Sequence, residues 1–337
     1  MKPTDFAYHL TNYLSRYLPG QLGVSANTIK SYRDTFMILI RYCKDQKGIP
    51  SERLLLKDLT RDVVEDFLMW LETERNCSIS TRNQRLSAIH AFFKYLQYEC
   101  PESIELFQRI ISIPTKRKPK KAFDYLTLEG VQAILSQPNQ STRGGFRDLV
   151  LLTLMYDSGA RVQEIADLTI SDLRLDEPAT VRLTGKGSKT RIVPLMSRTA
   201  ELLLKYSEHF RASNYLDSAP LFYNKKCEKL TRSGISFVLD KYTEMARRAN
   251  PKVVPLKVTP HTLRHSKAMH LLQSGVNIVY IRDVLGHSEI KTTEVYARAD
   301  THMKRKALVN ANQPEIQSEV PVWQKNNDLL CWLKNLG

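Results

Sequence analysis

The sequence predicts a mainly α-helical protein of two domains with a small β-hairpin in the second. Apolar residues recur at helical spacing through most of the 337 residues, and a Gly-Lys-Gly-Ser-Lys turn separates two β-branched segments. A proline-containing basic stretch at 113–121 interrupts the helical pattern. We therefore expect a helical domain over 1–112, a linker over 113–125, a mixed α/β domain over 126–300 and a tail over 301–337.

The first domain is expected to contain four helices. Residues 6–18 have apolar side chains at helical spacing, and Ser25 is a good N-cap for a second helix. A third helix follows Thr60, and a fourth starts near Ser80.

The first turns of this fourth helix are rich in polar side chains. Arg82, Asn83 and Arg85 can contact phosphates and base edges if the helix enters a major groove. A solvated helix start explains the same residues equally well.

The second domain is expected to combine helices with one hairpin. The hairpin spans 180–195. Helices are predicted at about 127–136, 144–157, 197–212, 231–248, 261–273, 277–285 and 289–298, with a short amphipathic helix at 327–336.

The charge is strongly basic and unevenly distributed. Fifty Lys and Arg against 35 Asp and Glu give +15, of which residues 1–115 contribute only +2. Such a surplus suits a polyanion, although many basic proteins bind no nucleic acid specifically. A basic linker can also lie along a phosphate backbone, through Lys116, Arg117, Lys118, Lys120 and Lys121.

Other features argue against membrane and secreted classes. No run of about 18 apolar residues is present, and the first residues lack the apolar core of a signal peptide. Five dispersed cysteines without a CxxC pair are typical of reduced thiols in a cytosolic protein.

Two motifs of the second domain have several interpretations. Lys186 and Lys189 in the hairpin turn are either surface charges or phosphate contacts, and no Walker motif indicates nucleotide hydrolysis. In HTLRH, His261 and His265 have a spacing found in zinc sites, but Thr262 replaces the glutamate of a zincin motif. His261 and Arg264 are better suited to one phosphate, with separate structural roles as the alternative.

Three further residues are ambiguous when taken alone. Arg161, at the start of a helix, could simply pair with Glu164 one turn later. His287 and Tyr296, nine residues apart, could each be ordinary packing residues.

The order of these motifs resembles the tyrosine recombinase family, in its phage-integrase and Xer-type branch. SGARVQEI is similar to the family's first-arginine box, HTLRH to its His-x-x-Arg box and LGHSEIKTTEVYAR to its nucleophile box. STRNQRLSAIHAFFKYL is similar to the last helix of its core-binding domain. The resemblance covers nearly the whole chain and implies a helical core-binding domain followed by a mixed α/β catalytic domain.

The resemblance also implies the reaction. Tyr296 would attack a DNA phosphodiester and form a 3′-phosphotyrosine, while Lys186 would protonate the leaving 5′-oxygen. The phosphate would be surrounded by Arg161, His261, Arg264 and His287, with Glu164 as a supporting acid. No ATP would be needed, because the covalent intermediate stores the bond energy, and no metal, because these side chains would supply the nucleophile, the charge neutralisation and the acid. Lys267 departs from the small residue that relatives more often carry, and the tail is longer than in minimal Xer-type proteins.

Partners and role follow from the same resemblance. We expect double-stranded DNA with inverted-repeat half-sites, a dimer on each site, a tetrameric synapse and a cytoplasmic, nucleoid-associated protein. A partner recombinase or a DNA-bending accessory protein, and docking of the tail on a neighbouring protomer, are further options. The preferred role is integration, excision or transposition of a mobile element. The alternatives are Xer-type dimer resolution, a type IB topoisomerase, a catalytically silent DNA-binding regulator and a zinc hydrolase.

Overall fold

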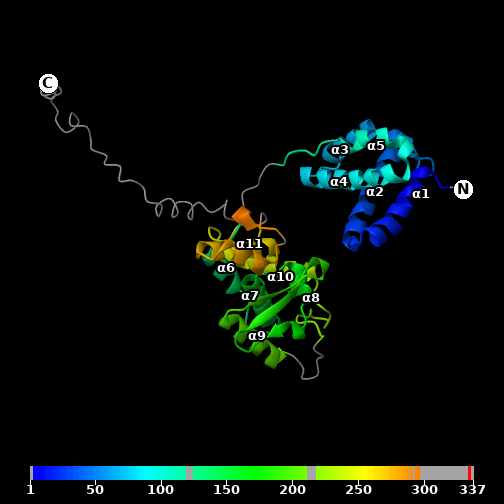
Figure 1. The fold of residues 1–337 in the computed structure, drawn as a ribbon. Helices are drawn as coiled ribbons and strands as arrows, with labels where there is room; N and C mark the ends of the chain where they lie inside the picture. The colour runs from blue at the N-terminus through cyan, green and yellow to red at the C-terminus, as the bar shows by residue number, and fades with distance from the viewer. Residues whose placement is uncertain are drawn as a thin grey trace. The chain divides into compact units, whose positions relative to one another are not determined.

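The structure is a computed structural model that describes residues 3–118, 124–210, 218–287, 289–290, 293–296 and 333–334. The chain divides into Met1–Lys121 and Ala122–Gly337, within the predicted linker, and each unit has its own core. Figure 1 follows the chain through both units. Lys120, Lys121 and nearly all of the predicted tail lie outside the described residues.

The first unit is helical throughout its described part. Phe92 lies at the centre of its core, with its ring 5.0 Å from that of Phe36 and 5.2 Å from that of Tyr13. These contacts join the helices across the unit. The elements are α1 (Asp5–Asn12), a π-helical segment (Tyr13–Gln21), α2 (Ala26–Lys47), α3 (Arg61–Thr73), α4 (Ile79–Glu99) and α5 (Ile104–Ile111), with short 3-10 turns at Leu56–Asp58 and Pro101–Ser103.

Two helices of this unit, α2 and α3, start where the sequence predicts. Ser25 caps α2 and Thr60 caps α3, each accepting a backbone N–H, as predicted. The fourth helix begins before the predicted Ser80, because Ser78 accepts the N–H of Thr81 at 3.2 Å. The helix α5 was not predicted.

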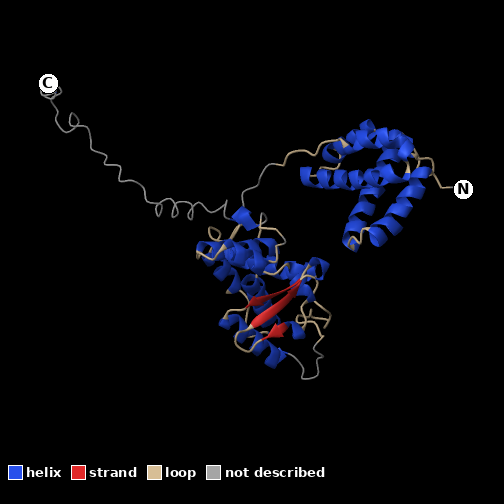
Figure 2. Ribbon diagram, in the orientation of Figure 1, coloured by secondary structure: helices blue, strands red, loops and turns tan. Residues whose placement is uncertain are grey.

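The second unit packs helices around a small antiparallel sheet, which Figure 2 shows in red. Strands β2 and β3 form the predicted hairpin, with Val181 opposite Val193, and β1 pairs with β2. The mainly α fold with a small sheet is therefore confirmed. The elements are α6 (Leu128–Leu135), α7 (Arg143–Ser158), α8 (Val162–Asp167), β1 (Leu173–Arg174), β2 (Thr180–Thr184), β3 (Thr190–Pro194), α9 (Ser197–Phe210), α10 (Arg232–Ala249), α11 (Pro260–Gln273) and α12 (Ile278–Leu285), with 3-10 turns at Ile170–Asp172 and Lys186–Ser188.

Two glycines end the helices that position the site. Gly159 follows α7 with φ 57° and Gly286 follows α12 with φ 63°, so both lie in the left-handed region. A Cβ at Gly286 would also lie 2.9 Å from the Arg191 side chain. No described helix is long and apolar enough to cross a membrane.

Candidate active site

The three motifs of the second unit meet at the end of α12. Arg161 donates from one guanidinium nitrogen to the carbonyl of Gly286 at 3.0 Å. Arg264 donates to the carbonyl of Leu285 at 2.5 Å and to that of Gly159 at 2.7 Å. Two arginines from different motifs are therefore attached to consecutive carbonyls beside His287.

Glu164 is the buried carboxylate that organises these cations. Its oxygens accept from Arg161 at 2.8 Å and from both terminal nitrogens of Arg191 at 2.8 Å. Arg191 lies on β3 and also donates to the carbonyl of Val284. Burial opposes ionisation of Glu164, but these bonds and the Arg191 charge outweigh it and lower its pKa to about 2.

The site carries a surplus of positive charge. Three guanidiniums, those of Arg161, Arg191 and Arg264, surround the single carboxylate of Glu164 among the groups just described. Burial, reinforced by the other two arginines, lowers the pKa of Arg264 to about 10. A cavity of about 770 Å³ opens beside them and is lined by Arg161, Arg191, Lys189, Arg282, Asp283 and His287 together with loop glycines. The excess of cationic side chains around this cavity favours the binding of an anion.

Tyr296 is brought into the same site. Its side chain is only 2% exposed and packs with Met269, Ile281 and Leu285. Its ring is stacked on His287, with centroids 6.4 Å apart and planes at 9°. Burial raises the pKa of Tyr296, while Arg264 and Arg161 act in the opposite direction.

Two histidines flank the cationic groups. The pKa of His287 falls to about 4 through burial and the charges of Arg264 and Arg161, and its Nδ1 lies 2.9 Å from the Thr293 hydroxyl. His261 is the more exposed, at the start of α11. The imidazole of His261 is partly shielded from water. This desolvation, together with the charges of nearby arginines, lowers the pKa of His261. Both are therefore neutral at pH 7.

The hairpin forms one wall of the cavity. Lys189 is exposed there, and its carbonyl accepts the N–H of Gly185 at 2.8 Å. The backbone of Lys186 starts the turn, whereas its side chain lies outside the description. Lys267, the departure noted in the sequence, forms an ion pair with Asp157 at 3.0 Å.

Sequence reasoning missed Arg191 and the role of His265. Arg191 lies two residues before the buried Val193 on β3, so both side chains are on the inward face of the strand. A charged residue there requires a partner, and this signal could have identified it. His265 was considered only as a zinc ligand, but its Nδ1 lies 2.9 Å from the hydroxyl of Tyr296. Within the described residues, no three His, Cys, Asp or Glu side chains gather in a group that could hold a metal ion.

The first unit uses two of its candidate residues internally. Arg82 is 6% exposed, lies 3.4 Å from Glu72 and donates to the carbonyl of Pro114. Asn83 bonds to both backbone groups of Lys116, whose ammonium pairs with Glu72 at 2.8 Å. These contacts hold residues 114–118 against the start of α4. Arg82 is therefore directed inward, toward Glu72 and the carbonyl of Pro114, and not toward solvent where a phosphate would lie.

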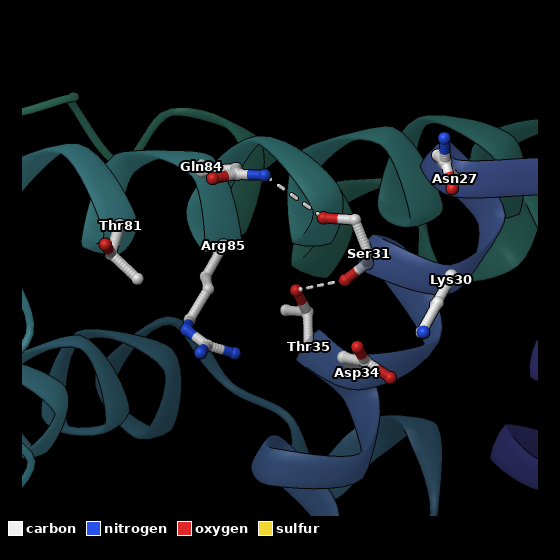
Figure 3. A pocket seen from close by; sticks show the side chains of 8 residues that line it. All are labelled: Asn27, Lys30, Ser31, Asp34, Thr35, Thr81, Gln84 and Arg85. Atoms are coloured by element: carbon white, nitrogen blue, oxygen red, sulfur yellow. Dashed lines mark hydrogen bonds between the residues drawn. The ribbon is translucent and has the colours of Figure 1, made fainter. Parts of the chain in front are cut away.

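Arg85 differs from Arg82 because it faces a pocket. This pocket of about 270 Å³ lies between the first turns of α2 and α4 (Figure 3). Gln84 donates to the Ser31 hydroxyl at 3.1 Å across it. Within the described residues, Nε of Arg85 is buried without a hydrogen-bond partner. The lining is otherwise polar, with Asn27, Lys30, Ser31, Asp34, Thr35 and Thr81.

Two family models match the two units. The model of the phage integrase family matches residues 124–303, and that of the N-terminal SAM-like domain of phage integrases matches residues 10–100.

Similar proteins cover most or all of the chain. A putative integrase/recombinase y4rC of Sinorhizobium fredii is 33% identical over 99% of both chains. Tyrosine recombinase XerC of Thermodesulfovibrio yellowstonii is 28% identical over 88% of this chain and 93% of its own.

Solved structures show the same fold. XerH recombinase in a post-cleavage complex has a TM-score of 0.66 at 22% identity, covering 87% of this chain and 81% of its own. The Tn1549 transposon integrase with transposon end DNA has a TM-score of 0.69 at 15% identity, covering 89% and 98%. The chain therefore belongs to the phage integrase family and is a tyrosine-type site-specific recombinase.

Proposed function

We propose that this recombinase cleaves and rejoins DNA through a 3′-phosphotyrosine on Tyr296. The observation that carries this proposal is the position of a buried tyrosine beside a surplus of guanidinium charge and a neutral His287. The Tyr296 oxygen would bond to phosphorus and give up its proton, which the neutral His261 would exchange near the phosphate, while the bond to the 5′-oxygen breaks and that oxygen takes a proton from Lys186. Rejoining is the same exchange in reverse, so no high-energy cofactor is consumed.

Each group at the site has a proposed task. Arg161 and Arg264 would bind the non-bridging oxygens, because each guanidinium has five N–H donors and the carbonyl bonds use only some of them. Glu164 and Arg191 would hold Arg161 in place. His261 and His287 would hydrogen-bond the phosphate, and Lys186 would donate a proton to the 5′-oxygen, as the family resemblance implies.

The first unit would bind the duplex beside the cleaved phosphate. Arg85 supports this, because its cationic side chain lines the pocket between α2 and α4 and its Nε has no hydrogen-bond partner among the described residues. Lys30 lines the same pocket and adds positive charge. Lys118 and Arg117, exposed where the chain leaves this unit, would contact the phosphate backbone.

The proposed substrate is double-stranded DNA with inverted-repeat half-sites, bound by a dimer and recombined in a tetramer. The proposed role is integration, excision or transposition of a mobile element. Similarity over 99% of both chains to a putative integrase/recombinase supports this role. Xer-type dimer resolution is the second candidate, supported by the similarity to XerC over 88% of this chain. Inverted repeats or element ends beside the gene would favour the first.

The chemical proposal is tested with a nicked suicide substrate, on which the covalent adduct accumulates. Tyr296→Phe should abolish the adduct and leave DNA affinity nearly intact. The control is Tyr242→Phe on α10, which removes a buried hydroxyl that donates to Asp148 on α7. It should still form adducts. Adducts from Tyr296→Phe would refute the assignment, and wild-type protein that binds but forms none would be a silent regulator.

A further inference from the structure

The nucleophile proposed above has a specific partner in the resting protein. Nδ1 of His265 lies 2.9 Å from the hydroxyl oxygen of Tyr296, and the ring centroids are 5.7 Å apart. Because Tyr296 is only 2% exposed, its hydroxyl has little access to water. A buried tyrosine hydroxyl needs such a partner to offset its desolvation. His265 therefore contributes to where this oxygen lies.

We propose that His265 is a positioning residue for the nucleophile, accepting the hydroxyl hydrogen of Tyr296 and so directing an oxygen lone pair toward the phosphate site. The proposal rests on the role of Tyr296 proposed above. His265 does not touch the phosphate in this scheme, and it acts through the tyrosine.

His265 lies on α11, the helix that also carries residues of the phosphate site. The same helix carries His261 and Arg264, and the His261 and His265 rings are stacked 6.2 Å apart. Arg264 and its neighbour Leu263 are buried, so this part of α11 is held firmly by packing. The bond to Tyr296 therefore attaches the short helical segment 293–296 to the element that holds the phosphate-binding arginine.

The protonation state of His265 is compatible with an acceptor. Burial, and secondarily the neighbouring His261 and Arg264, lower its pKa to about 4. It is therefore neutral at pH 7, and a neutral imidazole has one nitrogen that accepts. With the proton on Nε2, Nδ1 accepts from Tyr296 and leaves the tyrosine lone pairs available for attack.

The contact differs from the other restraints on the tyrosine. Stacking on His287 and packing against Met269 fix the ring. Rotation of the C–O–H group about the ring bond is not restrained by such contacts, whereas the bond to His265 does restrain it. Attack needs an aligned lone pair as well as a close oxygen, so a freely rotating hydroxyl would spend less time in the reactive orientation.

The test uses the full chain in single-turnover cleavage of the suicide substrate at saturating DNA. His265→Leu should reduce the rate of adduct formation roughly 10- to 100-fold without changing half-site affinity. His265→Asn should restore most of the rate, because its Oδ1 lies near the position of the imidazole Nδ1. Thermal melting of each variant confirms that it is folded.

A matched control is present on the same helix. His270 is half-buried, and its Nδ1 lies 2.8 Å from the hydroxyl of Tyr156. His270→Leu makes the same chemical change on α11 without touching the nucleophile, and it should cleave at the wild-type rate.

Several results would overturn the inference. They are an unchanged rate in His265→Leu, an equal loss in the Leu and Asn variants, and a faster rate in His265→Leu, which would mean that the bond keeps the hydroxyl away from the phosphate. Each leaves the proposed function standing as long as Tyr296→Phe forms no adduct. Adducts from Tyr296→Phe would instead refute the proposed function itself.

Discussion

Replacing Glu164 by Gln should destabilise the second unit strongly. The carboxylate is 2% exposed and bonds to both Arg161 and Arg191. Its pKa falls from 4.5 to about 2, and a shift of this size corresponds to about 3 kcal/mol. Removal of one partner from a buried ion pair independently costs about 3–5 kcal/mol. The two values agree, so we expect a loss of about 3 kcal/mol at pH 7.

Calorimetry of the full chain measures this effect. For a unit of this size, about 3 kcal/mol should lower the Tm of its transition by roughly 6–12 °C. The wild-type advantage is present above pH 4.5, since a lowered carboxyl pKa favours the folded, ionised form. It should shrink as the pH falls from 4.5 toward 2.

An exposed glutamate provides the control for this variant. Glu244 on α10 also pairs with two arginines, Arg247 and Arg248, but is half exposed. Glu244→Gln should leave the Tm unchanged within error. A Glu164→Gln protein that melts within about 2 °C of wild type would refute the view that Glu164 organises the site.

Four other predictions concern the reaction and the assembly. Excess EDTA should leave adduct formation unchanged, whereas a strict metal requirement would favour the hydrolase interpretation. Lys186→Ala should cleave normal DNA poorly but a 5′-thio substrate nearly as well as wild type. A thiolate, with a pKa of roughly 8.5, leaves without a proton, whereas an alkoxide is far more basic and needs one. Equal impairment on both substrates would exclude a general acid. His287 has a pKa of about 4, and the negative charge of a bound phosphate should raise that pKa. Half-site binding should therefore take up protons between pH 4 and 6.5 but not at pH 8, as calorimetry in two buffers would measure. No proton uptake in that range would place the phosphate away from His287. Truncation before Asn327 should spare half-site binding but impair assembly on paired sites in native gels, and unchanged assembly would contradict docking of the tail in trans.

Much of the secondary structure could be predicted from short stretches of the sequence. Caps such as Ser25 and Thr60 and the glycine-rich hairpin turn act within a few residues, so their effects can be predicted from short windows. The first helix continues as the π-helical Tyr13–Gln21, which the helical spacing of its apolar residues did not predict, and its Tyr13 ring stacks on Tyr32 of α2. Arg82 and Arg85 in the first turns of α4 look equivalent in sequence. In the structure, Arg82 pairs with Glu72 and donates to the carbonyl of Pro114, whereas Arg85 makes neither contact.

The active site divides in the same way. Motif order and local spacing were enough to nominate Arg161, Arg264 and Tyr296, because each motif carries its chemical groups within a few residues. The pair of Arg161 and Glu164, one helical turn apart, was predictable and is present at 2.8 Å. Their distant partners were not predictable, since Arg161 also bonds to a carbonyl 125 residues away and Glu164 to an arginine 27 residues away. A polar side chain becomes a site component when folding removes water and supplies a partner, and only the assembled unit determines which partner that is. For Tyr296 it is His265, 31 residues earlier in the chain.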